Sequence, residues 1–191
     1  MPLSKTDWTE AALLALARDG LAGVAVEPLA RRLGATKGSF YWHFADRAAL
    51  IAATLELYEQ RETTEVIDRI QAIPDPRERL TAIASDAYAG AATPNAHAGV
   101  LAAAADPRVA PVLTRITRTR LAYIEWLYTD LGLAPDLATR QARLAYALYL
   151  GISQLRRADP DHEPTGTALN AYLDLAVDVM MPPDRGRRTH Q

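Results

Sequence analysis

The sequence predicts an all-α fold of about nine helices. Apolar residues recur at intervals of three and four along most of the 191 residues, and no segment of any length shows the alternation typical of a β-strand. Prolines and glycines beside short polar residues divide this pattern into segments of helical length. Apolar residues make up 49% of the chain and charged residues 23%, which is typical of a globular protein.

Three short helices are predicted at the N-terminus. The first runs from Ser4, a favourable N-cap, to Gly20, which can adopt the left-handed conformation that ends a helix. The second covers about residues 27–33 and ends at Gly34, and the third covers about residues 36–44. Two short helices separated by a glycine turn are typical of a helix-turn-helix.

Longer helices follow. Asp46 is placed to cap a helix that runs from Arg47 to about residue 71. The further predicted helices cover about residues 77–91, 96–105, 108–131, 136–157 and 165–181. Residues 184–191 hold nothing to bury, so we expect a disordered tail there.

Composition and motifs exclude several classes of function. The chain has no cysteine, which excludes disulfides and thiolate chemistry. Its four histidines are widely separated, and it lacks a His-Glu-x-x-His helix, a glycine-rich phosphate loop and a nucleophile elbow. We therefore expect no enzyme, no metal and no cofactor. No secretory segment or membrane span is apparent, so the expected location is the cytoplasm, with no membrane partner.

Charge is distributed unevenly along the chain. The net charge is −2, yet residues 1–50 carry six basic and five acidic side chains, and the sum from Arg31 to Arg47 is +3. A short basic stretch is often only a solvated surface, so this asymmetry is by itself a modest indication of nucleic-acid binding.

Residues 26–44 meet the requirements of a helix-turn-helix that binds DNA. The inner faces are apolar, with Leu29, Ala30, Leu33, Phe40 and Phe44. The outward face of the second helix combines hydrogen-bonding, cationic and aromatic groups, which suit sugars, phosphates and base edges, whereas a protein-binding groove would more readily be apolar. We predict DNA contacts from Thr36, Lys37, Gly38, Ser39, Tyr41, Trp42 and His43, and from Arg47 at the start of the next helix.

The run from Gly34 to Phe44, followed by Asp46-Arg47 and Leu50, closely resembles the signature of the TetR (tetracycline-repressor-like) family. The resemblance covers about residues 8–55 and makes the outward residues of the second helix DNA-facing. It implies an N-terminal three-helix DNA-binding domain, residues 1–62, and a larger helical domain, residues 63–183, that dimerises and binds an effector.

One departure from the family pattern concerns the first helix of the motif. Family members usually place Ser or Thr at its start, whereas this chain has Ala25-Val26-Glu27-Pro28. The missing cap costs about 1 kcal/mol, and a glutamate beside DNA is unfavourable. We therefore expect the DNA contacts to come from the second helix rather than the first.

The remainder of the chain offers candidates for an effector pocket and a dimer interface, each of which could instead be ordinary core. Polar aromatic residues suit a mostly apolar pocket: Tyr58, Tyr88, His97, Tyr123, Trp126, Tyr146 and Tyr149. Wide apolar faces on the last two helices, which pair in dimers of the family, present Leu144, Leu148, Ile152, Leu155, Leu169, Leu173 and Ala176.

Together these features predict a sequence-specific transcriptional regulator. A homodimer would place two copies of the second motif helix in successive major grooves of a palindromic double-stranded operator, about 34–36 Å apart. A small-molecule effector would release this repressor by tilting the long helix that begins at Arg47. The alternative is a helix-turn-helix protein that acts without a ligand, through protein partners.

Overall fold

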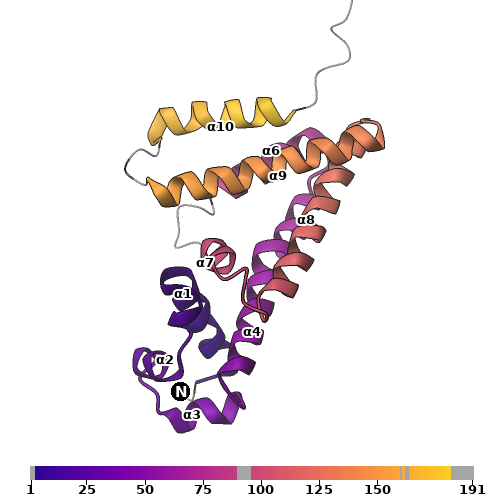
Figure 1. Cartoon of the computed structure of the whole chain (residues 1–191). Coiled ribbons are helices and arrows are strands. Elements are labelled where there is room, and N and C mark those ends of the chain that lie inside the picture. Colours follow the sequence, from indigo (N-terminus) through magenta and orange to yellow (C-terminus); the bar gives the residue numbers. More distant parts are fainter. Residues whose placement is uncertain (1–2, 90–95, 160, 162–163, 182–191) are drawn as a thin grey trace, which may run out of the picture. The chain divides into compact units, whose positions relative to one another are not determined.

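The computed structural model describes residues 3–89, 96–159, 161 and 164–181, and this part of the chain is helical without a strand (Figure 1). Its elements are α1 (Lys5–Gly23), α2 (Val26–Arg32), α3 (Lys37–His43), α4 (Arg47–Glu59), the π-helical segment η1 (Gln60–Thr64), α5 (Glu65–Gln71), α6 (Pro76–Ala89), α7 (Ala96–Ala102), α8 (Ala110–Asp130), α9 (Pro135–Ala158) and α10 (Gly166–Met180).

The all-α prediction is confirmed. Because α4, η1 and α5 follow one another without interruption, they form one helix over Arg47–Gln71, and the described residues then hold the nine helices that the sequence predicts. The sequence gives no sign of the π-helical segment inside this long helix, which buries Thr63. The expected disordered tail, residues 184–191, lies outside the described residues.

Two compact units make up the chain. The first comprises Met1–Asp68 with Ala91–Thr119, and the second comprises Arg69–Gly90 with Arg120–Gln191. The first unit therefore contains α1 to α4, η1 and α7, and the second contains α6, α9 and α10. Each unit has its own cluster of buried apolar side chains.

In the first unit, α1 is the central helix. It packs against α7, α4 and α2, and α2 packs in turn against α3. The largest fully buried side chains of this core are Trp8, Leu16, Leu29, Phe40, Leu50, Ile51, Leu55, Tyr58 and Ile116. The contact between α1 and α7 is close because Gly99 brings its backbone against the carbonyl of Leu16.

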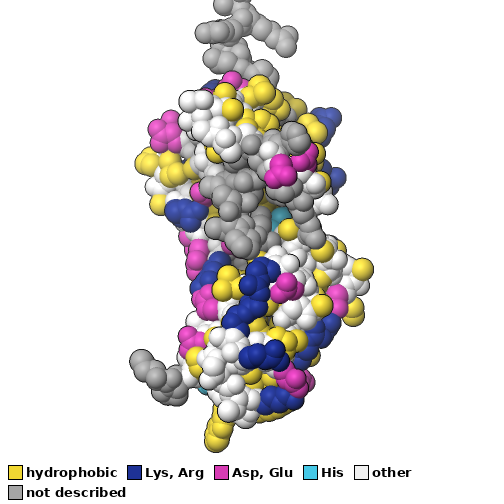
Figure 2. All heavy atoms as spheres, turned by 90° about the vertical axis from the view of Figure 1, so that its left-hand side faces the viewer, with side chains coloured by type: hydrophobic (Ala, Val, Ile, Leu, Met, Phe, Trp, Pro, Cys, Tyr) yellow, Lys and Arg dark blue, Asp and Glu magenta, His cyan; other side chains and the backbone are white. Residues whose placement is uncertain are grey.

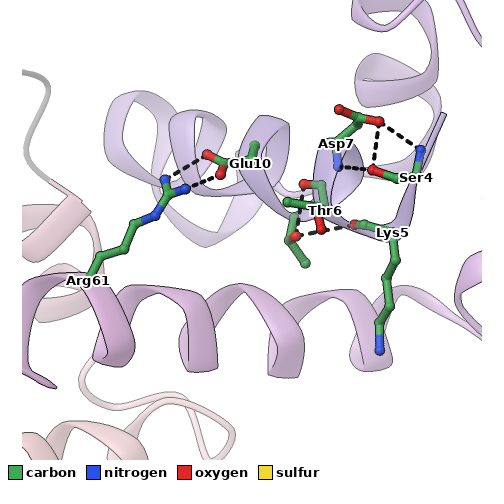
Figure 3. A network of polar contacts seen from close by, with 7 residues as sticks. Ser4, Lys5, Thr6, Asp7, Glu10 and Arg61 are labelled. Atoms are coloured by element: carbon green, nitrogen blue, oxygen red, sulfur yellow. Dashed lines mark hydrogen bonds and ion pairs between the residues drawn. The ribbon is translucent and has the colours of Figure 1, made fainter. Parts of the chain in front are cut away.

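Local signals set the helix boundaries of this unit. Ser4 caps α1 in a capping box with Asp7, whose carboxylate accepts the Ser4 N–H at 2.7 Å (Figure 3). Gly20 has φ +64° and breaks the helical backbone where the sequence predicts an end, although three more residues continue as a short turn. Asp46 caps α4 as predicted and accepts the Ala49 N–H at 2.8 Å.

The second unit joins α6, α9 and α10, with α6 packed against both of the others. Its core includes Leu80, Leu127, Tyr128, Ala142, Tyr146 and Met180. The Tyr128 hydroxyl donates to the Met180 carbonyl oxygen at 2.8 Å, which ties α8 to the end of α10. Burial of this phenol raises its pKa to about 12, so it stays a neutral hydrogen-bond donor.

The close approach of α7 to α1 is testable by substitution of Gly99. A β-carbon there would lie 2.2 Å from the Leu16 carbonyl oxygen, so we expect Gly99→Ala to lower the free energy of unfolding by about 1–3 kcal/mol. Gly38→Ala is the matched control, because its β-carbon meets only Thr36 Oγ1, at 3.6 Å. Urea denaturation followed by circular dichroism measures both, and equal midpoints would contradict the close packing.

Candidate nucleic-acid interface

A single buried side chain fixes the orientation of α3. Phe40 is fully buried and meets the Trp8 ring edge-to-face, with centroids 5.4 Å apart. It also stacks with Phe44, directly after the helix, at 5.6 Å. The turn before α3 passes through Gly34, whose φ of +63° is a left-handed conformation that favours glycine. Since Phe40 faces the core, the opposite side of α3 faces outward.

That outward side carries large aromatic groups in solvent. Trp42 is 88% exposed and Tyr41 is 61% exposed, although one side of the Tyr41 ring meets Phe40 edge-to-face at 5.2 Å. Burial of such rings is normally favourable by a few kcal/mol, and their exposure indicates a surface that another molecule covers. The other predicted DNA contacts on this segment are exposed at Thr36, Lys37 and Gly38 and half-buried at Ser39 and His43.

Two of the polar residues on this segment already have partners in the chain. The Thr36 hydroxyl accepts the Ser39 N–H at 3.2 Å and so caps α3. The Lys37 ammonium forms an ion pair with the Glu27 carboxylate on α2. Hydrogen bonding and charge attraction within this pair lower the pKa of Glu27 and raise the pKa of Lys37, so both groups stay charged at neutral pH.

Arg47 has a role that the sequence does not reveal. Its guanidinium donates from Nε to the Val24 carbonyl oxygen at 2.5 Å and from Nη2 to the Leu21 carbonyl oxygen at 2.7 Å. These carbonyls lie more than twenty residues earlier in the chain, after the kink in α1. Arg47 therefore fastens the start of α4 to the segment that enters α2, while its contact with a phosphate stays a prediction.

Electrostatically, the surface of the first unit is mixed rather than uniformly basic. In the lower part of the space-filling view, Lys and Arg side chains lie among Asp and Glu side chains (Figure 2). Arg61 and Glu10 form one such ion pair between η1 and α1 (Figure 3). Among the described residues, no group of three or more His, Asp or Glu side chains could hold a metal ion, and no helix could cross a membrane.

A comparison with protein-family models shows what the helix-turn-helix region is similar to. Residues 9–54 match the family model of bacterial regulatory proteins, tetR family, and this range includes all of α2 and α3. Through this region, the chain is similar to the tetR family of bacterial regulatory proteins. No curated protein matches the chain.

Solved structures of TetR-like regulators share the fold over nearly the whole chain. A transcriptional regulator from Rhodococcus sp. Rha1 is 22% identical with a TM-score of 0.74, covering 93% of this chain and 94% of its own. A TetR-family regulator from Rhodococcus sp. is also 22% identical, with a TM-score of 0.72 and coverages of 93% and 98%. FadR from Bacillus subtilis, solved with stearoyl-CoA, is 14% identical, with a TM-score of 0.65 and coverages of 93% and 97%.

The predicted pocket residues fall into two groups, one in each unit. Tyr58 on α4 and His97 on α7 belong to the first unit, where both are buried and the Tyr58 hydroxyl lies 2.5 Å from His97 Nδ1. The side chain of Tyr88 lies outside the part that the structure describes. The second unit holds the remaining candidates, Tyr123, Trp126, Tyr146 and Tyr149.

Within the second unit, one aromatic pair carries an unusual polar group. Tyr123 and Trp126 stack at 5.6 Å, and the Arg79 guanidinium carbon lies 5.2 Å from the centre of the Trp126 ring. The Tyr123 hydroxyl oxygen is buried without a hydrogen-bond partner among the described residues, and this burial raises the pKa of its phenol. Tyr146, by contrast, is part of the core.

The predicted dimer residues differ in exposure within a single chain. On α9, Leu144 and Leu155 are 65% and 67% exposed, whereas the others are half-buried: Leu148, Ile152, Leu169, Leu173 and Ala176. The structure adds two exposed apolar residues on α10 that the sequence analysis missed, Leu175 and Val179. Their spacing of four residues gives one stripe on the helix, a signal that was present in the sequence.

Loss of the Arg47 clamp is expected to destabilise the first unit. Arg47→Met removes both hydrogen bonds and leaves the Leu21 and Val24 carbonyls without this donor, so we expect the free energy of unfolding to fall by about 2 kcal/mol. Arg32→Met is the control, because that side chain is exposed on α2. Chemical denaturation compares the two, and an effect no larger than that of the control would argue against the clamp.

Proposed function

We propose that this chain is a homodimeric, sequence-specific transcriptional regulator that binds a palindromic operator through α3 and is released by a small-molecule effector. The observation that carries the proposal is the exposure of Tyr41 and Trp42 beside Lys37, on a helix that Phe40 anchors from the opposite side. The similarity of residues 9–54 to a family of bacterial regulatory proteins supports it independently.

The composition of α3 suits the major groove of DNA. An α-helix fits this groove, where Lys37 and His43 can reach phosphates or base edges and the aromatic rings can contact sugars and thymine methyl groups. Gly38 is exposed and adds no side chain, which permits a close approach of the helix backbone to the groove. Since the operator lies on bacterial DNA, we place the protein in the cytoplasm.

Dimerisation is supported by the exposed apolar side chains of α9 and α10. Leu144 and Leu155 on α9 and Leu175 and Val179 on α10 are each at least 60% exposed in the isolated chain. Burial of each leucine against a second copy would contribute about 1.5–3 kcal/mol. A twofold dimer would also present two copies of α3 to the two halves of a palindromic operator.

Release by an effector is supported by the buried contact between α4 and α7. Tyr58 lies about three helical turns after the start of α4, which directly follows the DNA-facing segment, and its hydroxyl meets His97 on α7. A ligand that displaces α7 would therefore move α4 and, through it, α3. A small or lipid-like molecule is the class of effector we propose, and repression is the expected mode.

Substitution of the exposed aromatic residues tests the DNA interface. Selection from a randomised duplex library with the wild-type protein would supply the operator. Trp42→Ala and Tyr41→Ala should each weaken its binding about tenfold or more, because each removes contact area in the groove. Trp126→Ala is the matched control, since this tryptophan is also exposed but lies in the second unit. Fluorescence anisotropy gives the affinities, and wild-type binding by both α3 variants would refute the assignment.

Charge introduced on α9 tests the dimer. The double variant Leu144→Glu with Leu155→Glu should be a folded monomer, because two carboxylates would be buried at the proposed interface. Gln154→Glu adds a carboxylate to the same helix without removing an apolar side chain and should stay dimeric. Analytical ultracentrifugation measures the mass of each, and a double variant that remains a dimer would place the interface elsewhere.

A further inference from the structure

The ion pair between Glu27 and Lys37 connects the two helices of the helix-turn-helix. Glu27 lies in the first turn of α2 and Lys37 in the first turn of α3, and both side chains are more than half exposed. Lys37 is the only lysine or arginine on α3. The sole permanent positive charge of the DNA-facing helix is thus neutralised by a carboxylate of the same chain.

We propose that Glu27 is a specificity-determining residue, which occupies the Lys37 ammonium and so suppresses binding to DNA of arbitrary sequence. This inference rests on the proposed function and concerns how the same surface discriminates among duplexes. Glu27 would thus take part in recognition through Lys37, although its own carboxylate repels phosphate.

Proteins bind non-operator DNA mainly through charge. Such binding comes almost entirely from phosphate neutralisation by lysine and arginine, and each neutralised phosphate releases condensed counterions. A lysine already paired with a carboxylate brings no net charge to the duplex, so Lys37 adds little to this binding. The nearby negative charge of Glu27 also repels the phosphates directly.

Glu27 weakens binding to the operator less than it weakens binding to other DNA. Exposed ion pairs are weak, contributing less than about fivefold to an equilibrium constant, so an acceptor held at the right distance can replace the carboxylate. In the operator complex, the contacts of Tyr41 and Trp42 would bring α3 close enough for Lys37 to exchange Glu27 for a phosphate or a base edge. The Glu27 carboxylate therefore lowers the affinity for DNA of arbitrary sequence more than it lowers the affinity for the operator.

A competing explanation is that Glu27 only stabilises α2. An acidic residue in the first turn of a helix interacts favourably with the helix dipole, and α2 lacks a side-chain cap at Ala25. That role does not involve Lys37, so a double substitution separates the two explanations.

The experiment measures the affinity of Glu27→Gln for two labelled duplexes across a series of salt concentrations. One duplex is the operator selected with the wild-type protein, and the other has mixed sequence without palindromic symmetry. We expect Glu27→Gln to bind the mixed-sequence duplex about five- to tenfold more tightly, to bind the operator less than about threefold more tightly, and to steepen the dependence of log K on log salt for the mixed-sequence duplex by about one.

Two controls make the result specific. Glu56→Gln removes the same charge from an exposed position on α4 and should change neither affinity. In a Lys37→Met background, the gain from Glu27→Gln on the mixed-sequence duplex should shrink to about twofold, because the paired cation is absent and only the direct repulsion between Glu27 and phosphate remains. Circular dichroism checks that all variants keep the helical content of the wild type.

Four results would be decisive against the proposals. An unchanged affinity and salt dependence in Glu27→Gln would overturn the role of Glu27, as would an undiminished gain in the Lys37→Met background or an equal gain on both duplexes. Wild-type protein that selects no duplex from the library would instead overturn the proposed function itself, so the two failures are distinguishable.

Discussion

The packing of Phe40 against Trp8 is the contact on which the functional surface depends. α3 has seven residues, too few for a helix to be stable on its own in water, and Phe40 is its one buried residue. The edge-to-face contact with Trp8 gives α3 a fixed rotation about its axis. Because rotation of a helix decides which side chains face outward, this one core contact determines that Tyr41 and Trp42 are exposed.

Two further contacts make the surroundings of this anchor rigid. Asp46 caps α4 immediately after the segment that holds Phe44, and Arg47 joins the same point to the carbonyls of Leu21 and Val24. The end of α1 therefore meets the start of α4, where Arg47 satisfies two backbone carbonyls and Asp46 satisfies a backbone N–H of α4. A site held on fixed helices in this way is more exact than one on loops.

Much of the fold was predictable from the sequence because its determinants are local. Ser4 and Asp46 are good N-caps with their backbone partners three residues away, and Gly34 supplies the left-handed turn, so the helix boundaries near them follow from short stretches. The outward face of α3 was also predictable, since Phe40 and Phe44 repeat at four residues and leave the intervening positions free.

Other features were not predictable because they depend on residues far apart in the sequence. The partners of Arg47 lie 23 and 26 residues away, and the Tyr58 hydroxyl meets a histidine 39 residues later. The π-helical segment Gln60–Thr64 has no local signature. The pocket candidates were selected only because they are polar aromatic residues. They divide between the two units, because residue type does not encode which core a side chain enters.

The distribution of acidic groups is compatible with the proposal that a chain of net charge −2 binds DNA through α3. Several acidic side chains of the first unit serve the fold: Asp7 and Asp46 lie at the positive ends of helices, and Glu10 is paired with Arg61. Their charge is directed at groups of the protein itself. Glu27 differs, because its partner Lys37 belongs to the DNA-facing set. If α3 binds DNA as proposed, its single lysine, already paired with Glu27, gives little attraction to phosphate, and binding would draw its energy from contacts that only a well-fitted duplex provides. The exposed rings of Tyr41 and Trp42 can supply such contacts, which makes shape and base contacts, rather than charge, the main source of discrimination on this surface.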